Sequence, residues 1–129
     1  MSLNVLPDPS PAPNTPSTKV SPEVIEQVAN YFKVLSEPSR LHLLCELRSG
    51  PKNVSELLAA TGMGQANASK HLKILTDAGI LSRQPRGVSV YYQIRDPACF
   101  ELCEVVCRQI LRQHEQQSQY LRHLVALHP

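Results

Sequence analysis

Residues 53–94 read NVSELLAATGMGQANASKHLKILTDAGILSRQPRGVSVYYQI, and this stretch decides the fold. Its apolar residues recur at helical spacing over 54–60 and again over 65–77. The intervening Thr61-Gly62-Met63-Gly64 carries two glycines, as a tight turn between helices requires. The pattern predicts a helix-turn-helix.

The second half of the same stretch favours strands. Residues 80–83 and 88–94 are short β-favouring runs, and the proline-glycine segment 84–87 between them predicts the turn of a hairpin. A hairpin directly behind a helix-turn-helix is typical of a wing. We therefore expect a mainly α protein with a small β-hairpin, a winged helix-turn-helix of about five helices.

Apolar residues at helical spacing also occur on both sides of residues 53–94, which we call the head. A cap and a first-turn proline at Ser21-Pro22 predict a helix that ends near residue 36. A second helix should begin near Pro38 and stop at Gly50, and a long last helix should run from 97 to about 127. Cys45 lies among leucines of the second helix, which predicts a buried thiol.

The amino-acid composition predicts the domain organisation and the cellular location. Residues 1–20 hold five prolines among small polar residues, which predicts a disordered arm, and 21–128 then form one domain. No apolar run approaches the ~20 residues of a membrane span, and the N-terminus lacks the pattern of a secretion signal. We expect a cytoplasmic protein, in which the four cysteines are reduced at rest and need no structural disulfides.

Charge is unevenly distributed along the chain. The formal net charge is only +2, yet residues 51–95 contain six basic side chains against two acidic ones. Basic residues gathered on both helix and wing favour a nucleic-acid partner over a merely solvated surface. The expected partner is double-stranded DNA.

The helix over 65–77 has one apolar and one polar face. With Leu72 turned inward, Ala68 and Leu75 lie beside it, whereas Asn67 and Lys70 point outward. We predict a DNA-contacting set of Gln65, Asn67, Ser69, Lys70, His71 and Lys73 on this helix, with Arg83 and Arg86 on the wing. For His71, packing against the preceding helix is an equally weighted alternative.

The long last helix needs an apolar partner. The first helix and its counterparts in a second copy would supply one, which predicts a two-fold homodimer. Two heads would then read half-sites about one turn of DNA apart.

Three runs resemble the bacterial ArsR/SmtB repressors: LSEPSRLHLLCEL (35–47), VSELLAATGMGQANASKHLKIL (54–75) and GVSVYYQIRDP (87–97). The resemblance covers roughly residues 22–111. It implies a homodimeric repressor that occupies an operator and leaves it when an inducer binds.

The usual metal sites of that family are not matched here. A zinc-type pattern starting at Asp96 would require ligands at three positions that hold Ala98, Gln109 and Arg112. The thiolates of a Cys-Val-Cys site would fall at Asn53 and Ser55. The tail imidazoles His114, His123 and His128 are more typical of solvated residues, so no resident cofactor is expected.

Four cysteines remain as candidate sensors. Cys99, Cys103 and Cys107 recur every four residues on the apolar face of the last helix. Core packing is the plain interpretation of any one of them. Cys99 and Cys107 would lie roughly 12 Å apart, too far to share an ion. Neighbouring pairs could bind soft arsenite or a similar thiophile with Cys45 as the third thiolate, for example Cys45, Cys103 and Cys107.

The resemblance implies a second possibility, redox or reactive-sulfur sensing. Some sulfide and persulfide sensors of this family carry one cysteine in the second helix and another in the last. Cys45 matches the first position, while the second would fall at Leu111, one turn beyond Cys107. We favour release by disulfide or polysulfide formation between Cys45 and a last-helix cysteine over the arsenite alternative.

The sequence disfavours two other classes of protein. A cysteine-nucleophile enzyme is disfavoured because thiols on an apolar stripe should have raised pKa values and low reactivity. A winged-helix module that binds protein is disfavoured by the outward lysines and arginines of the head. We expect no enzymatic activity.

Overall fold

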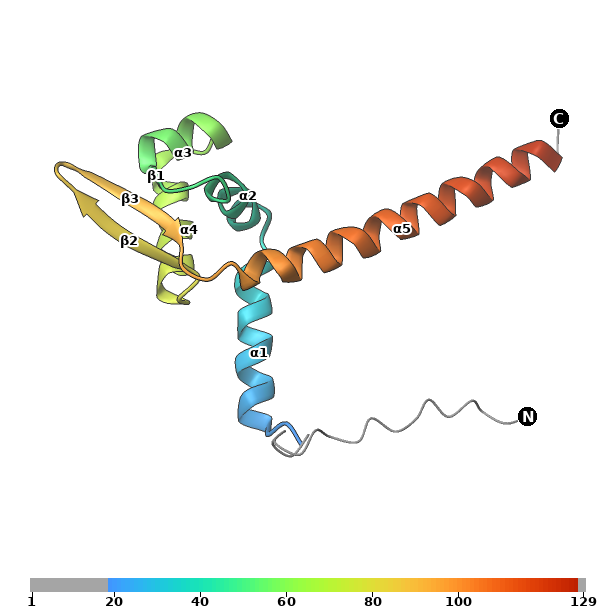
Figure 1. Ribbon diagram of the computed structural model, residues 1–129, viewed down its shortest axis with the longest axis horizontal. Coiled ribbons are helices and arrows are strands. Elements are labelled where there is room, and N and C mark those ends of the chain that lie inside the picture. Colours follow the sequence, from blue (N-terminus) through green and yellow to red (C-terminus); the bar gives the residue numbers. More distant parts are fainter. Residues whose placement is uncertain (1–18, 128–129) are drawn as a thin grey trace.

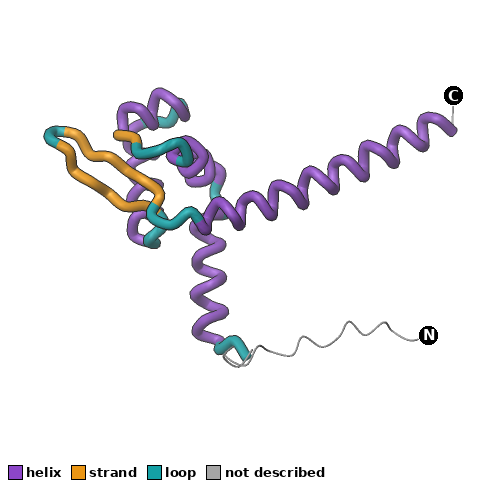
Figure 2. Tube along the Cα trace, viewed as in Figure 1, coloured by secondary structure: helices purple, strands orange, loops and turns teal. Residues whose placement is uncertain are grey.

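The computed structural model describes residues 19–127, which form five helices and one three-stranded antiparallel sheet (Figures 1 and 2). In chain order the elements are α1 (Pro22–Leu35), α2 (Pro38–Leu47), β1 (Lys52–Asn53), α3 (Val54–Thr61), α4 (Gln65–Asp77), β2 (Leu81–Arg86), β3 (Ser89–Ile94) and α5 (Ala98–Leu127). The predicted mainly α winged helix-turn-helix is confirmed. The predicted arm lies outside the described residues, except for its last two.

Local sequence sets the ends of the helices. The Ser21 side chain accepts a hydrogen bond from the Val24 N–H at 3.3 Å, so α1 begins where the serine-proline pair predicts. Asn53 and Glu56 form a reciprocal capping box at the start of α3. Gly62 ends α3 with a φ of 73°, a left-handed conformation that glycine adopts without strain. These signals hold α3 and α4 close together as a helix-turn-helix.

The hairpin turn lies later than predicted. Arg86 pairs with Ser89, so Gly87 and Val88 alone form the turn, whereas the sequence predicted a turn over 84–87. Gly87 has a φ of 63°, which a two-residue hairpin turn requires at its first position. Pro85 is therefore inside β2, where it is tolerated because β2 is an edge strand in the order β1-β3-β2. The two-residue strand β1 was not predicted.

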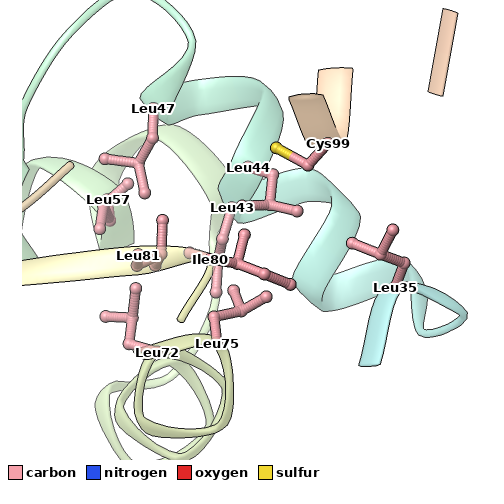
Figure 3. Packing of buried hydrophobic residues seen from close by; sticks show 10 residues of the cluster. All are labelled: Leu35, Leu43, Leu44, Leu47, Leu57, Leu72, Leu75, Ile80, Leu81 and Cys99. Carbon is pink, nitrogen blue, oxygen red and sulfur yellow. The ribbon is translucent and has the colours of Figure 1, made fainter. Parts of the chain in front are cut away.

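The core lies between α2, α3, α4 and the base of the wing. Leu43, Leu57, Leu72 and Leu75 are completely buried within it (Figure 3). The full cluster comprises Leu35, Leu43, Leu44, Leu47, Leu57, Leu72, Leu75, Ile80, Leu81 and Cys99. Leu35 is the only member of this cluster from α1, and Cys99 is the only member from α5. The last turn of α1 and the first turn of α5 therefore attach these two helices to the core.

The helices α1 and α5 leave the head in different directions (Figure 1). Their surfaces carry most of the exposed large apolar side chains in the described part of the chain: Val24, Ile25, Val28 and Phe32 on α1, and Leu102, Val105, Val106, Ile110, Leu111, Tyr120, Leu121 and Val125 on α5. Apolar surface of this extent indicates a protein partner. Within residues 19–127, no helix is both long enough and apolar enough to span a bilayer.

Candidate DNA-binding surface and thiol cluster

The helix α4 presents a polar face to solvent. Ala68, Leu72 and Leu75 are completely buried against the head, as the helical wheel predicts. Exposed on α4 are Gln65, Asn67, Ser69, Lys70 and Lys73. Gly64 at the N-cap has no side chain to cap the helix, so the first N–H groups of α4 are available to a phosphate.

His71 does not belong to this exposed face. Its side chain is only 6% exposed, Nδ1 lies 3.2 Å from Nη1 of Arg40, and Nε2 lies 3.7 Å from Oε2 of Glu37. The prediction of a DNA contact by His71 is therefore corrected, because the imidazole faces α2. Packing against a preceding helix is the role that the structure supports.

The two lysines of α4 differ in their surroundings. The Nζ of Lys73 donates to Asp77 at 2.8 Å, and this hydrogen bond raises the pKa of Lys73. Among the described residues, no carboxylate lies within ion-pair distance of Lys70. Lys70 is thus the cation of α4 that has its full charge available for a phosphate or a base edge.

The wing adds a second cationic element beside α4, which packs directly against β2. Arg83 and Arg86 are both exposed on β2. The Arg86 guanidinium lies 4.9 Å from the centre of the Tyr91 ring and donates to Gln84 at 3.4 Å. This cation–π contact holds the arginine along the hairpin, near its tip.

The four cysteines have three different environments. Cys99 is buried in the core beside Leu44 (Figure 3), Cys103 is partly buried, and Cys45 and Cys107 are exposed. The prediction that Cys45 is buried is wrong, because the leucines of α2 turn toward the head while Cys45 lies on the side facing away from the core. An exposed Cys45 can meet a reagent from solvent.

The C-terminal end of α2 contacts the first turns of α5 through its C-cap residue, Arg48. Arg48 donates to Glu104 at 2.6 Å, and its guanidinium lies 5.3 Å from the centre of the Phe100 ring. Cys45 is one helical turn before Arg48, and Cys103 is one turn beyond Phe100, so both thiols lie along the same junction.

The pKa values of the α5 thiols reflect this junction. Burial raises the pKa of Cys103, and the nearby thiols of Cys45 and Cys107 act in the same direction. Burial likewise raises the pKa of Cys99, with the Cys103 thiol as a further cause. The expected rise of thiol pKa on the apolar stripe is confirmed for these two residues. Cys45 of α2 thus lies close enough to Cys103 of α5 to contribute to the raised pKa of Cys103.

The thiols do not form a preformed metal site. Within residues 19–127, no three His, Cys, Asp or Glu side chains come close enough together to hold an ion. The three-thiolate set of Cys45, Cys103 and Cys107 is thus not assembled in a single chain, and an ion could bind it only after movement of α2 or α5.

These environments predict an order of alkylation by iodoacetamide at neutral pH. We expect Cys45, which is exposed on α2, to react first, and the partly buried Cys103 and the buried Cys99 to react more slowly. A raised pKa leaves less thiolate at neutral pH, so the rate at Cys103 should rise steeply as the pH is increased. Peptide mass spectrometry measures the rates, with protein unfolded in urea as the control. Equal rates at Cys45 and Cys99 in folded protein would contradict these environments.

Several residues that organise the site were missed from the sequence. Glu37 caps α2 and faces His71, while Arg40 donates to α1 and α4. The glutamate-proline pair 37–38 is a recognisable helix start, but a pair such as Arg48 and Glu104 leaves no trace in sequence spacing.

Together, the fold, the exposed face of α4 and the arginine-bearing hairpin define a winged helix-turn-helix DNA-binding protein. Residues 37–83 match the family described as bacterial regulatory protein, arsR family. The HTH-type transcriptional regulator NmtR of Mycobacterium tuberculosis is 34% identical over 91 residues, which cover 70% of this chain and 76% of NmtR. The chain belongs to the ArsR family, and it is a DNA-binding transcriptional repressor rather than an enzyme.

Solved structures agree with this assignment. The AntR antimony-specific transcriptional repressor superposes with a TM-score of 0.67 at 31% identity, over 82% of this chain and 97% of AntR. The homodimeric winged helix-turn-helix domain of Mb0332 from Mycobacterium bovis superposes with a TM-score of 0.64 at 30% identity, over 76% of this chain and 96% of that domain.

Proposed function

We propose that this repressor acts as a cytoplasmic homodimer and leaves its operator when Cys45 of α2 becomes covalently linked to a cysteine of α5, foremost Cys103. The observation that supports this proposal is the contact between the end of α2 and the start of α5 at Arg48 and Glu104, one helical turn from Cys45 and beside Cys103 in sequence. DNA contacts are assigned to Gln65, Asn67, Ser69, Lys70 and Lys73 of α4 and to Arg83 and Arg86 of the wing.

The homodimer is supported by the apolar faces of α1 and α5. These side chains are exposed in the single chain, and a two-fold partner that offers the same two helices would cover them. The relative Mb0332 is described as homodimeric. One head offers few contacts, so two heads joined by these helices are the unit expected to bind an operator.

The linking chemistry begins at the exposed thiol. With hydrogen peroxide, the Cys45 thiolate attacks one oxygen and breaks the O–O bond, which gives a sulfenic acid and a hydroxide ion that takes a proton from solvent to become water. The Cys103 thiol then attacks the sulfenic sulfur and displaces a second water to form the disulfide. With an organic persulfide, Cys45 takes the outer sulfur and releases the organic thiol. Cys103 then attacks the Cys45 persulfide and releases hydrogen sulfide. Cys103 is the resolving thiol because burial and its raised pKa keep it protonated longer.

A link at this junction would move the DNA-binding head. Cys45 lies on α2, which packs against α4, and Cys103 lies on α5, which we assign to the dimer. Pulling the two helices together changes the position of α4 relative to the dimer axis, so the two heads no longer match their half-sites. We expect operator affinity to fall on oxidation and to recover with a reductant.

The second candidate is an arsenite-responsive or related thiophile-responsive repressor. Its support is the soft-ligand character of three thiolates and the structural likeness to AntR, which is described as antimony-specific. In this reading Cys45, Cys103 and Cys107 bind one metalloid after α2 and α5 approach each other.

The experiment compares wild type with Cys45→Ser, Cys103→Ser and Cys107→Ser. Each protein is treated with peroxide, an organic persulfide or arsenite, and its intact mass and operator affinity are measured in parallel. We expect wild type to lose the mass of two hydrogen atoms with peroxide and to release DNA. Cys45→Ser and Cys103→Ser should stay bound, and Cys107→Ser should respond like wild type.

Three results would change this proposal. If Cys107→Ser is unresponsive and Cys103→Ser responds, then the partner of Cys45 is Cys107. Release by arsenite alone, lost in all three variants, would favour the metalloid reading. An unchanged response of Cys45→Ser to every reagent would refute both.

A further inference from the structure

The helix α2 connects the elements of the head to both long helices. Among the described residues, every side-chain hydrogen bond between one helix and another comes from Arg40 of α2 or from Arg48 at the C-cap of α2. Arg48 bonds to α5, and Arg40 bonds to both α1 and α4. Within residues 19–127, Arg40 is therefore the polar side chain that bonds to both α1 and α4, in addition to the apolar packing of the core.

Arg40 uses its whole guanidinium for this connection. Its Nε donates to the Val34 carbonyl at 2.6 Å and its Nη2 to the Lys33 carbonyl at 3.3 Å, both in the last turn of α1. Carbonyls at a helix C-terminus carry partial negative charge, so they suit a cation, although the Lys33 carbonyl also accepts from the N–H and the hydroxyl of Ser36. Arg40 thus fixes the end of the helix that we assign to the dimer interface.

The third nitrogen of Arg40 fixes the recognition helix. Its Nη1 lies 3.2 Å from Nδ1 of His71, which is 6% exposed. Arginine has only donors, so Nδ1 must be the acceptor and the imidazole proton lies on Nε2, facing Glu37 at 3.7 Å. The contact specifies one tautomer of a neutral histidine. It holds α4 from its buried side and leaves the exposed face free.

We propose that Arg40 is a positioning residue which, through its bond to His71, sets the separation of the two α4 helices in the dimer. The inference rests on the proposed homodimer and extends it to the choice of operator. A dimer whose heads are rigidly placed should accept only one spacing of half-sites. One inserted base pair rotates a half-site by about 35° around the duplex and demands a matching movement of the head.

The test measures the spacing preference. A duplex is selected from a random-sequence pool by the wild-type protein, and one or two base pairs are then inserted between its half-sites. We expect wild type to lose roughly 10-fold in affinity for each inserted base pair. Arg40→Ala should lose only a few-fold, because its two heads can move relative to each other and follow the displaced half-site. Affinities are measured by fluorescence anisotropy well below the unfolding temperature.

Two histidine variants separate positioning from stability. The amide oxygen of His71→Asn lies close to the place of Nδ1 and can still accept from Arg40, whereas the longer amide of His71→Gln lies closer to the place of Nε2. His71→Asn should keep the spacing preference and His71→Gln should lose it. The control is Asn53→Ala, which removes the α3 capping box and lowers stability away from this contact. It should keep the wild-type preference.

The outcomes separate this inference from the homodimer itself. If Arg40→Ala is dimeric and keeps the full spacing preference, or if His71→Gln keeps it and His71→Asn loses it, then Arg40 does not position α4. Should Arg40→Ala fail to fold, the histidine pair alone decides. A wild-type protein that sediments as a monomer on its selected duplex would overturn the homodimer and this inference together.

Discussion

Replacing Lys70 by alanine is expected to weaken operator binding by roughly 30-fold, because a dimer loses two cationic contacts of about 1 kcal/mol each. Lys70 is exposed at the outward face of α4 and has no carboxylate within ion-pair distance among the described residues. Its charge is free to replace counterions on the duplex, so the salt dependence of binding should become shallower in the variant. Anisotropy titrations over a range of salt concentrations measure both effects.

Two matched variants show whether the loss is specific. Lys73→Ala removes a lysine from the same helix, but that lysine already bonds to Asp77 at 2.8 Å, so we expect a smaller effect. Arg112→Ala removes an exposed cation from α5, far along the helix from the head, and should leave the affinity unchanged. If Lys70→Ala binds as tightly as wild type with the same salt dependence, the outward face of α4 does not read the operator.

Replacing Ile110 by aspartate is expected to separate the dimer and abolish operator binding at concentrations where wild type is fully bound. Ile110 is 46% exposed in the single chain and belongs to the apolar face of α5. Two unpaired carboxylates buried at a two-fold interface should weaken dimerisation by about 100-fold or more. Analytical ultracentrifugation gives the dimer dissociation constant, and circular dichroism shows whether the helices persist.

The control variant introduces the same negative charge on a different face of α5. Gln119→Asp adds the same negative charge to an exposed polar position of α5, away from the apolar stripe, and should leave the dimer intact. A dimeric Ile110→Asp with wild-type operator affinity would show that this part of α5 is not the interface. Loss of helix in Ile110→Asp alone would indicate unfolding, and Val28→Asp on α1 would then be the second test.

The helices were predictable because their signals are local. Caps such as Ser21 and Asn53, together with the period of the leucines, define the bounds of α1 and α3 from a few adjacent residues. The inward face of α4 followed from the same period. The orientation of a helix relative to its neighbours was harder to predict. Cys45 lies among leucines in the sequence, but the sequence of α2 alone does not show which side of the helix faces the core.

The predictions were wrong or incomplete where contacts between residues far apart in the sequence determine the local structure. The hairpin turn depends on the left-handed conformation of Gly87, which outweighs Pro85 as a turn signal once β2 pairs with β3. The strand β1 exists only because Lys52 and Asn53 meet Tyr92 and Tyr91, about forty residues later. His71 is buried because Arg40 and Glu37 satisfy its ring, and a buried polar side chain of this kind has no periodic pattern to reveal it.

The order of strands in the wing has a consequence for the free protein. The strand β2 is an open sheet edge, and an open edge is a template onto which strands of other molecules can add. An incoming strand here meets Pro85, which has no N–H to offer, and the exposed charges of Arg83 and Arg86. The same two arginines that are assigned to DNA therefore also protect the hairpin from self-association whenever the repressor is off its operator.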